Sequence, residues 1–282
     1  MPVIEIQEPS LKKTEGIHLW HGEISSCSQR VRMALAEKHL SWESHLIDIT
    51  KNEHATPEFQ RINPKGLVPA YLDNGTLVIE SCDIIDFIDQ KYPKNILRPE
   101  YEGASTQVDD WLKKADKAQK DLKLLSHEFL FRPRKNMSAE EIDTFEKNHN
   151  NSELTTFIRE WQESEMLPKE KIETAVNRTD NDFKSLDGAL ETKEWILGNV
   201  FSLADIAWIP NIHRMCLMEW PLDRYPNLNK WFERVRSRPC YQEALVNWEP
   251  DGLKERFSGY LRERKDKSRI HVTAFGVLAR AA

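Results

Sequence analysis

Residues 17–39 read IHLWHGEISSCSQRVRMALAEKH, and this stretch decides the fold of the first part of the chain. The apolar run at 17–20 predicts a short strand, which a serine-rich turn separates from a helical pattern. The apolar side chains that share one side of the helix predicted over 29–39 are Val31, Met33, Ala34 and Leu35. The order strand, turn and helix indicates an α/β unit.

The following segments complete a small sheet. Residues 42–49 alternate enough to return as a strand parallel to the first one. Residues 67–72 and 76–79 flank an Asp-Asn-Gly turn, and Asn-Gly accepts the positive φ angles of a tight hairpin. The next helix starts at Ser81 and is expected to bury Ile84, Ile85, Phe87 and Ile88.

A second domain is expected over residues 103–250, because β signals nearly vanish and helical spacing dominates. Its first helix is predicted over 105–131 and stops at the proline that follows. Ser202 and Asp205 have the spacing of a capping box in front of a buried helix. With the first domain at 15–95, the predicted fold is an α/β domain followed by an all-α helical bundle.

Two segments exceed what such a bundle needs. Residues 132–172 are strongly polar, and we expect them to be an insertion that extends from the bundle. Residues 251–282 form a tail that is expected to reach over the active site. The aromatic side chains of this tail are Phe257, Tyr260, His271 and Phe275.

Composition excludes several classes of partner. The 282 residues are 39% hydrophobic and 30% charged with a net charge of -6, which is typical of a globular protein and argues against nucleic acid. No run of about 18 apolar residues and no signal-peptide pattern occurs, so no membrane and a cytoplasmic location are expected. The cysteines lie far apart and the nine histidines are scattered, so no metal is expected.

Three short motifs of the first domain carry chemistry. They are Ser25-Ser26-Cys27-Ser28-Gln29-Arg30-Val31-Arg32, Asn63-Pro64-Lys65-Gly66-Leu67-Val68-Pro69, and Glu80-Ser81 at a helix start. Each motif is common on its own, since a serine-rich turn before a helix is usually only a cap. Their order within one small domain is what makes them specific.

Together these motifs resemble those of the glutathione transferase superfamily, and the first is similar to the zeta class. The resemblance covers about residues 17–245 and includes Trp195-Ile196-Leu197-Gly198 in the second domain. It implies a thioredoxin-like first domain and glutathione as the co-substrate. The polar insertion is more similar to the ganglioside-induced differentiation-associated group, and the long tail to bacterial β-etherase-type transferases.

The resemblance also implies roles for individual residues. Ser25 occupies the position of the thiol-binding residue, and Ser26 is the next candidate. Pro69 would form a cis peptide bond that exposes the Val68 backbone to the cysteinyl part of glutathione.

The two ends of glutathione need charged or polar partners. Ser81, at a helix N-terminus, suits the γ-glutamyl carboxylate. Glu80 suits the γ-glutamyl ammonium group, and Lys65 the glycine carboxylate.

Activation of the thiol requires one good hydrogen bond. Lowering a thiol pKa of about 8.5 by ~2 units takes about 2.7 kcal/mol, and a charge-assisted hydrogen bond supplies roughly 1.5 to 3 kcal/mol. Cys27 offers a competing mechanism, in which a thiolate at a helix start forms a mixed disulfide with glutathione and acts as a thiol transferase or reductase.

The expected function is therefore attack of glutathione on an electrophilic carbon of a small hydrophobic, aromatic substrate, with an aryloxide or a halide as the leaving group. A transferase-like protein that binds glutathione or acts as a scaffold, with little catalysis, is the alternative. The family implies a dimer, either of identical chains or with a related chain. The side chains considered for the substrate pocket are Trp111, His127, Phe131, Trp208, His213 and Trp220.

Overall fold

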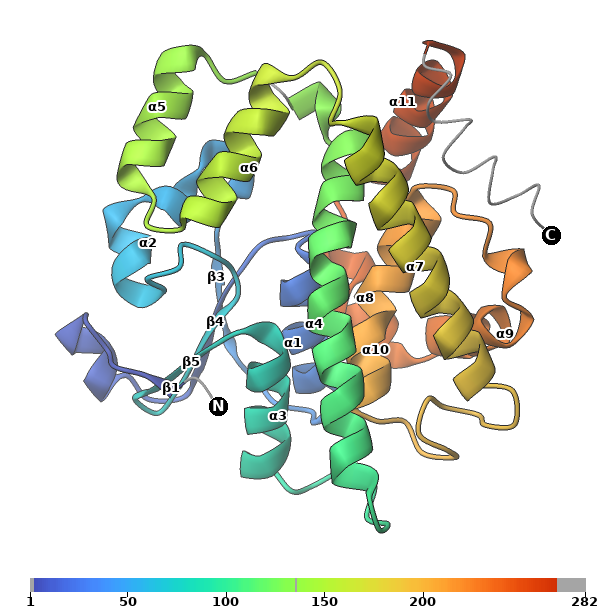
Figure 1. Ribbon diagram of the computed structural model, residues 1–282. Helices are drawn as coiled ribbons and strands as arrows, with labels where there is room; N and C mark the ends of the chain where they lie inside the picture. Colours follow the sequence, from blue (N-terminus) through green and yellow to red (C-terminus); the bar gives the residue numbers. More distant parts are fainter. Residues whose placement is uncertain (1–2, 135, 268–282) are drawn as a thin grey trace. The chain divides into compact units, whose positions relative to one another are not determined.

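The computed structural model describes residues 3–134 and 136–267, which fall into two compact units (Figure 1). The first unit lies within Met1–Asn95, Asn136–Glu163 and Gln242–Glu249. The second lies within Ile96–Lys135, Ser164–Tyr241 and Pro250–Ala282. Both units are thus assembled from segments that are distant in sequence.

The first unit is built on a five-stranded sheet with the order β1-β5-β4-β2-β3. Its strands are β1 (Val3–Ile4), β2 (Ile17–His21), β3 (Glu43–Leu46), β4 (Ala70–Asp73) and β5 (Thr76–Ile79). Strand β2 is parallel to β3 and antiparallel to β4. The β4–β5 turn has positive φ at Asn74 and Gly75, which confirms the predicted hairpin.

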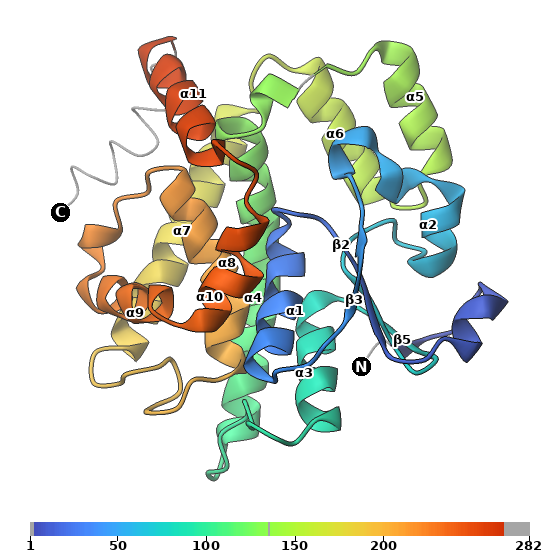
Figure 2. The ribbon, with the colours of Figure 1, turned by 180° about the vertical axis from the view of Figure 1, so that it is seen from behind.

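Helices cover both faces of this sheet. They are α1 (Ser26–Glu37), α2 (Pro57–Ile62) and α3 (Ser81–Lys91), with the short helices η1 (Pro9–Lys13), η2 (Ile49–Lys51) and η3 (Glu53–Ala55). Figures 1 and 2 show α1 and α3 on one face and α2 on the other, which confirms the thioredoxin-like α/β fold. Phe87 is only half-buried, contrary to expectation, and contacts Tyr71 edge-on.

The polar insertion contains two helices, α5 (Ala139–Asn148) and α6 (Ser152–Glu163), which group with the first unit. This differs from the expected extension of the bundle. The Gln60 side chain in α2 donates to the carbonyl of Asn148 over 2.7 Å and accepts from the Asn150 N–H over 3.1 Å. The physical reason for the difference is that polar contacts and one small apolar cluster attach the insertion to the first unit. The hydropathy pattern does not indicate such contacts. That cluster comprises Ala55, Phe145 and Leu154.

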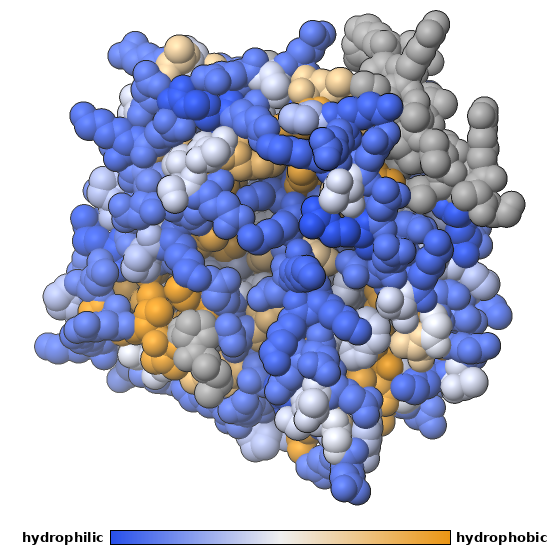
Figure 3. All heavy atoms as spheres, in the orientation of Figure 1, coloured by the Kyte–Doolittle hydropathy of each residue, from blue (hydrophilic) through white to orange (hydrophobic). Residues whose placement is uncertain are grey.

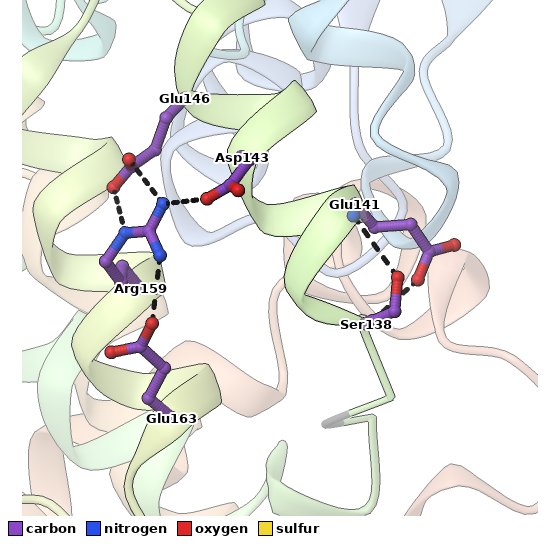
Figure 4. Close-up of polar contacts among 6 residues, drawn as sticks. All are labelled: Ser138, Glu141, Asp143, Glu146, Arg159 and Glu163. Carbon is purple, nitrogen blue, oxygen red and sulfur yellow. Dashed lines mark hydrogen bonds and ion pairs between the residues drawn. The ribbon is translucent and has the colours of Figure 1, made fainter.

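Ion pairs join the two helices of the insertion (Figure 4). Arg159 on α6 donates to Asp143 and Glu146 on α5, both over 2.6 Å, and to Glu163 on its own helix over 2.9 Å. At the start of α5, Ser138 and Glu141 form a complete capping box. The polar composition of this segment therefore builds a defined helical hairpin.

The second unit is all-helical, as predicted. Its elements are α4 (Ala104–Phe129), η4 (Arg132–Arg134), α7 (Lys169–Ala189), α8 (Leu203–Leu217), η5 (Leu222–Arg224), α9 (Pro226–Arg236) and α11 (Leu253–Lys267). The chain also forms α10 (Pro239–Ala244) and η6 (Val246–Trp248). Helix α4 packs against both α7 and α8. None of the helices described is long and apolar enough to cross a membrane.

The face drawn in Figure 3 is mostly hydrophilic, in keeping with a chain in which 30% of the residues are charged. Apolar side chains reach the surface in several separate elements. The exposed large apolar residues include Val3, Leu46, Ile49, Ile96, Tyr101 and Val200.

The carboxylate of Asp205 fixes the core of the second unit. Its oxygens accept hydrogen bonds from the Ser202 N–H over 2.9 Å, the Ser202 hydroxyl over 2.7 Å, the Ile196 N–H over 3.0 Å and the Trp231 indole N–H over 2.8 Å. The predicted capping box is confirmed. Asp205 is fully buried, and burial raises the pKa of its carboxyl group.

We expect Asp205→Ala to lower the free energy of unfolding by about 3 to 5 kcal/mol, because it leaves buried donors without an acceptor. Chemical denaturation of the purified chain measures this change. The exposed Asp223→Ala is the matched control and should change stability by less than about 0.5 kcal/mol. A loss below about 1 kcal/mol for Asp205→Ala would show that the four hydrogen bonds do not fix this core.

Candidate functional site

Ser25 caps the helix that begins the first motif. It precedes α1, and its hydroxyl oxygen accepts from the Ser28 N–H over 3.3 Å. This cap explains why α1 begins earlier than hydropathy alone indicates. Because a hydroxyl has acceptor lone pairs and one O–H donor, capping uses a lone pair of Ser25 and leaves its O–H to donate. Ser25 can thus cap α1 and hydrogen-bond to an anion at the same time.

Ser26 and Cys27 are the first two residues of α1. Both are half-buried, and Cys27 carries a thiol and not a disulfide. The N-terminal end of a helix favours negative charge, so all three candidates of this motif share one electrostatically suitable place.

Arg32 holds the loop that leads into α1. Its guanidinium donates to the carbonyls of Gly22 over 3.0 Å, Glu23 over 2.8 Å and Ala244 over 2.7 Å. Only 1% of Arg32 is exposed, and burial lowers its pKa to about 9. Arg32 therefore positions the segment that carries Ser25, a role that the sequence analysis missed.

Arg30 connects the first motif to the third. It is fully buried, and its Nη1 donates to the Ser81 hydroxyl over 3.1 Å and lies 3.4 Å from the Cys82 sulfur. A signal for this was present in the sequence, because Arg30 precedes Ala34 by one helical turn on the apolar side of α1. The contact places a positive charge at the start of α3, beside the residue expected to bind a carboxylate.

Glu80 and Lys65 form an ion pair between the third and second motifs, with 2.6 Å between Oε1 and Nζ. Both side chains are partly exposed. Glu80 has φ 67° and ψ 116°, a backbone conformation that non-glycine residues rarely adopt and that clusters at functional sites. The two residues were expected to bind opposite ends of glutathione, and the structure pairs them with each other.

The loop at 63–69 carries the second motif. The Val68–Pro69 peptide bond is cis, as the resemblance implied. Pro69 is buried and Val68 half-buried, directly before β4. Asn63 braces the loop, because its side chain donates to the Leu67 carbonyl over 2.5 Å and accepts from the Lys65 N–H over 3.0 Å.

His149, from the insertion, supports the same loop. Its Nε2 lies 3.1 Å from the Gly66 carbonyl oxygen. Gly66 has φ 58°, and a Cβ added there would lie 2.4 Å from His149 Nε2 and 3.1 Å from the His54 carbonyl oxygen. Glycine is therefore required at this position by both conformation and space. No sequence signal pointed to His149.

The rings of His54 and His149 lie close together, with their centroids 5.9 Å apart. Burial, together with the nearby His149, lowers the pKa of His54 to about 4. Burial also lowers the pKa of His149. Within the part of the chain that the structure describes, Nδ1 of His54 is buried without a hydrogen-bond partner. The insertion thus contacts the loop through His149, whose ring also packs against His54.

The structure separates the aromatic residues considered for the substrate pocket. Trp208, His213 and Trp220 are buried, and Nδ1 of His213 is 2.7 Å from the Tyr241 hydroxyl. The half-buried residues are Trp111, His127 and Phe131. In the tail, Phe257 is buried and its ring contacts that of Phe131, whereas His271 and Phe275 lie outside the described residues.

Comparison with known proteins gives matches to two family models. Residues 24–91 match the model described as glutathione S-transferase, N-terminal domain. Residues 150–239 match the model described as glutathione S-transferase, C-terminal domain.

The matches to individual relatives span nearly the whole length of each relative. Glutathione S-transferase Z1 of Arabidopsis thaliana is 29% identical over 230 residues, covering 80% of this chain and 90% of the relative. The probable maleylacetoacetate isomerase of Vibrio cholerae is 26% identical over 233 residues, covering 80% and 94%. The β-etherase LigF from Sphingobium sp. strain SYK-6 is a structural neighbour with a TM-score of 0.75, 24% identity and coverage of 81% and 98%, which shows a shared fold.

The close fit of Gly66 against His149 leads to a first test of the loop. We expect Gly66→Ala to raise the KM for glutathione roughly 10-fold or more, because the new methyl group displaces the loop and strains its backbone by about 1 to 3 kcal/mol. Steady-state kinetics at varied glutathione concentration measure this effect. His149→Ala combined with Gly66→Ala removes the steric overlap and should recover part of the loss, whereas an unchanged KM in the single variant would contradict the role of this contact.

The lowered pKa of His54 predicts acid sensitivity. The unfolded chain protonates this imidazole near pH 6.5 and the folded chain near pH 4, so stability is full above about pH 6.5 and is lost as pH falls towards about 4. The free energy of unfolding is measured with urea at about pH 7 and at about pH 4.5. Replacing His54 by Gln should reduce the difference between these two values by at most about 3 kcal/mol. The exposed His39→Gln serves as the control, and equal slopes for both variants would refute the assignment.

Proposed function

Because the chain belongs to the glutathione S-transferase superfamily, we propose that Ser25 activates the glutathione thiol for attack on an aromatic electrophile. The chain is a glutathione transferase and glutathione is its co-substrate. The observation that carries the proposal for Ser25 is its hydroxyl, which caps α1 and still has its proton to donate.

The γ-glutamyl carboxylate is proposed to bind at the start of α3. Arg30 donates to the Ser81 oxygen, so the Ser81 O–H can point to a carboxylate. The first-turn amides of α3 and the Arg30 charge add to the attraction.

We propose that the Lys65–Glu80 ion pair opens when glutathione binds. The γ-glutamyl ammonium group takes the place of Lys65 beside Glu80, and Lys65 turns to the glycine carboxylate. A partly exposed ion pair contributes only about 0 to 1 kcal/mol, so this exchange costs little. The Val68 backbone, displayed by Pro69, would pair with the cysteinyl segment.

The Ser25 hydroxyl would donate to the sulfur and lower the thiol pKa. One charge-assisted hydrogen bond contributes roughly 1.5 to 3 kcal/mol, and the N-terminus of α1 adds up to about 1 kcal/mol. Together they are enough to lower the thiol pKa by ~2 units. Cys27 remains the rival, because its thiolate could form a mixed disulfide with glutathione at the same helix start.

The proposed reaction is nucleophilic displacement. The thiolate forms a carbon–sulfur bond, and the carbon–oxygen or carbon–halogen bond breaks to release an aryloxide or a halide. The fold shared with a protein named for β-etherase activity supports the ether-cleaving form of this reaction.

Substitutions at the start of α1 distinguish the two thiol mechanisms. Ser25→Ala should lower kcat/KM with an aryl halide about 10- to 100-fold. It should also raise the pKa of the thiol of bound glutathione, which is measured by the absorbance of the thiolate. Ser25→Thr keeps both the cap and the hydroxyl and should restore most of the activity. Cys27→Ala should leave the rate nearly unchanged.

The opposite pattern, with loss in Cys27→Ala and none in Ser25→Ala, would make Cys27 the reactive group. A chain that fails to bind glutathione on an affinity matrix would favour the scaffold alternative.

A further inference from the structure

Two histidines and a glutamate meet at the edge of the first unit's sheet. Strand β3 is an edge strand and pairs in parallel with β2, in a register that aligns His18 with Glu43 and Trp20 with His45. Because side chains alternate along a strand, His18, Glu43 and His45 project from the same face. No metal was expected from the sequence, because these histidines are distant along the chain and only the strand register brings them together.

The three side chains have the spacing of metal ligands. Nδ1 of His18 is 2.9 Å from Nε2 of His45. Oε2 of Glu43 lies 3.5 Å from Nδ1 of His18, and Oε1 of Glu43 lies 3.6 Å from Nε2 of His45. A tetrahedral zinc ion with ligand bonds of about 2.0 to 2.1 Å has ligand atoms about 3.3 Å apart. With one ligand atom taken from each residue, all three lie within 4.8 Å of one another, so a small movement of the Glu43 carboxylate would bring them to the spacing of zinc ligands.

The hydrogen bonds of His18 present the correct nitrogen. Its Nε2 lies 3.0 Å from the Glu15 carbonyl oxygen, which can only accept, so Nε2 carries the proton. The lone pair on Nδ1 then faces His45 and Glu43. Bound metals commonly have histidine ligands oriented by a backbone carbonyl in this way.

His45 is held by packing and is accessible to solvent. Its ring stacks on Trp20 with centroids 4.6 Å apart. When an ion replaces the hydrogen bond between the two histidines, the Nε2 proton of His45 moves to its Nδ1 through solvent. The side chains of His45 and Glu43 are 29% and 64% exposed, which gives an ion a way in.

We propose that His18, Glu43 and His45 bind a divalent transition-metal ion, best matched by Zn²⁺, with water completing the coordination. Two imidazole nitrogens and one carboxylate suit zinc and its first-row neighbours, whereas Mg²⁺ and Ca²⁺ take oxygen ligands. The ion would link edge strand β3 to β2. The site shares no residue with the proposed glutathione site.

Metal titration of the full chain tests this proposal. The protein is prepared without an affinity tag, stripped with a chelator and kept free of glutathione, which itself binds zinc. Calorimetry with Zn²⁺ should show one ion per chain, and Co²⁺ should give the visible absorption of a four-coordinate complex. Removal of a residue that only hydrogen-bonds to a metal ligand weakens metal binding about 10- to 100-fold. Glu43→Gln and His45→Asn alter the ligands themselves, so each should weaken Zn²⁺ binding more than ~10-fold.

Matched variants control for nonspecific binding. Glu58→Gln and His39→Asn make the same chemical changes at exposed positions of the first unit and should bind Zn²⁺ like the unaltered chain. Zn²⁺ should raise the melting temperature of these controls and leave that of Glu43→Gln and His45→Asn nearly unchanged. Binding that survives both ligand substitutions would place the ion elsewhere and overturn the proposal. Failure of the unaltered chain to bind Zn²⁺ more tightly than His45→Asn would overturn it as well.

Discussion

The contact between the buried Arg30 guanidinium and the Ser81 hydroxyl is the constraint on which the proposed glutathione site depends. It joins α1 to the start of α3, so the two helix N-termini of the site are held by one group. A buried guanidinium is costly to desolvate, and such a charge is retained only where it is well paired. The same charge that ties the helices together also suits the anionic ligand of the family.

The insertion extends this arrangement to the loop at 63–69. His149 contacts the Gly66 carbonyl, and Gln60 bonds to the backbone on either side of His149. The insertion therefore supports the loop that carries Lys65 and Val68. Variation in the insertion would then alter glutathione binding without changing any residue that is proposed to contact the ligand.

The sequence predicted the local features well and the distant contacts poorly. The Asn74-Gly75 turn and the Ser202/Asp205 capping box were predictable, because short-range geometry restricts which residues fit. Strand β1 was missed because two residues carry no periodic signal. The Lys65–Glu80 pair and the place of the insertion depend on polar contacts across long separations, which hydropathy does not encode. The site residues remain a prediction from the motifs, and the contacts by which Arg30 and Arg32 position their segments became visible only in the structure.

The bond from Arg32 to the carbonyl of Ala244 has a consequence for synthesis of the chain. Residues 242–249 belong to the first unit, so that unit is not contiguous in sequence. On the ribosome, the loop before α1 lacks this partner until Ala244 has emerged. Domains usually fold in the order of translation, but here the N-terminal unit cannot finish before most of the C-terminal unit has been made.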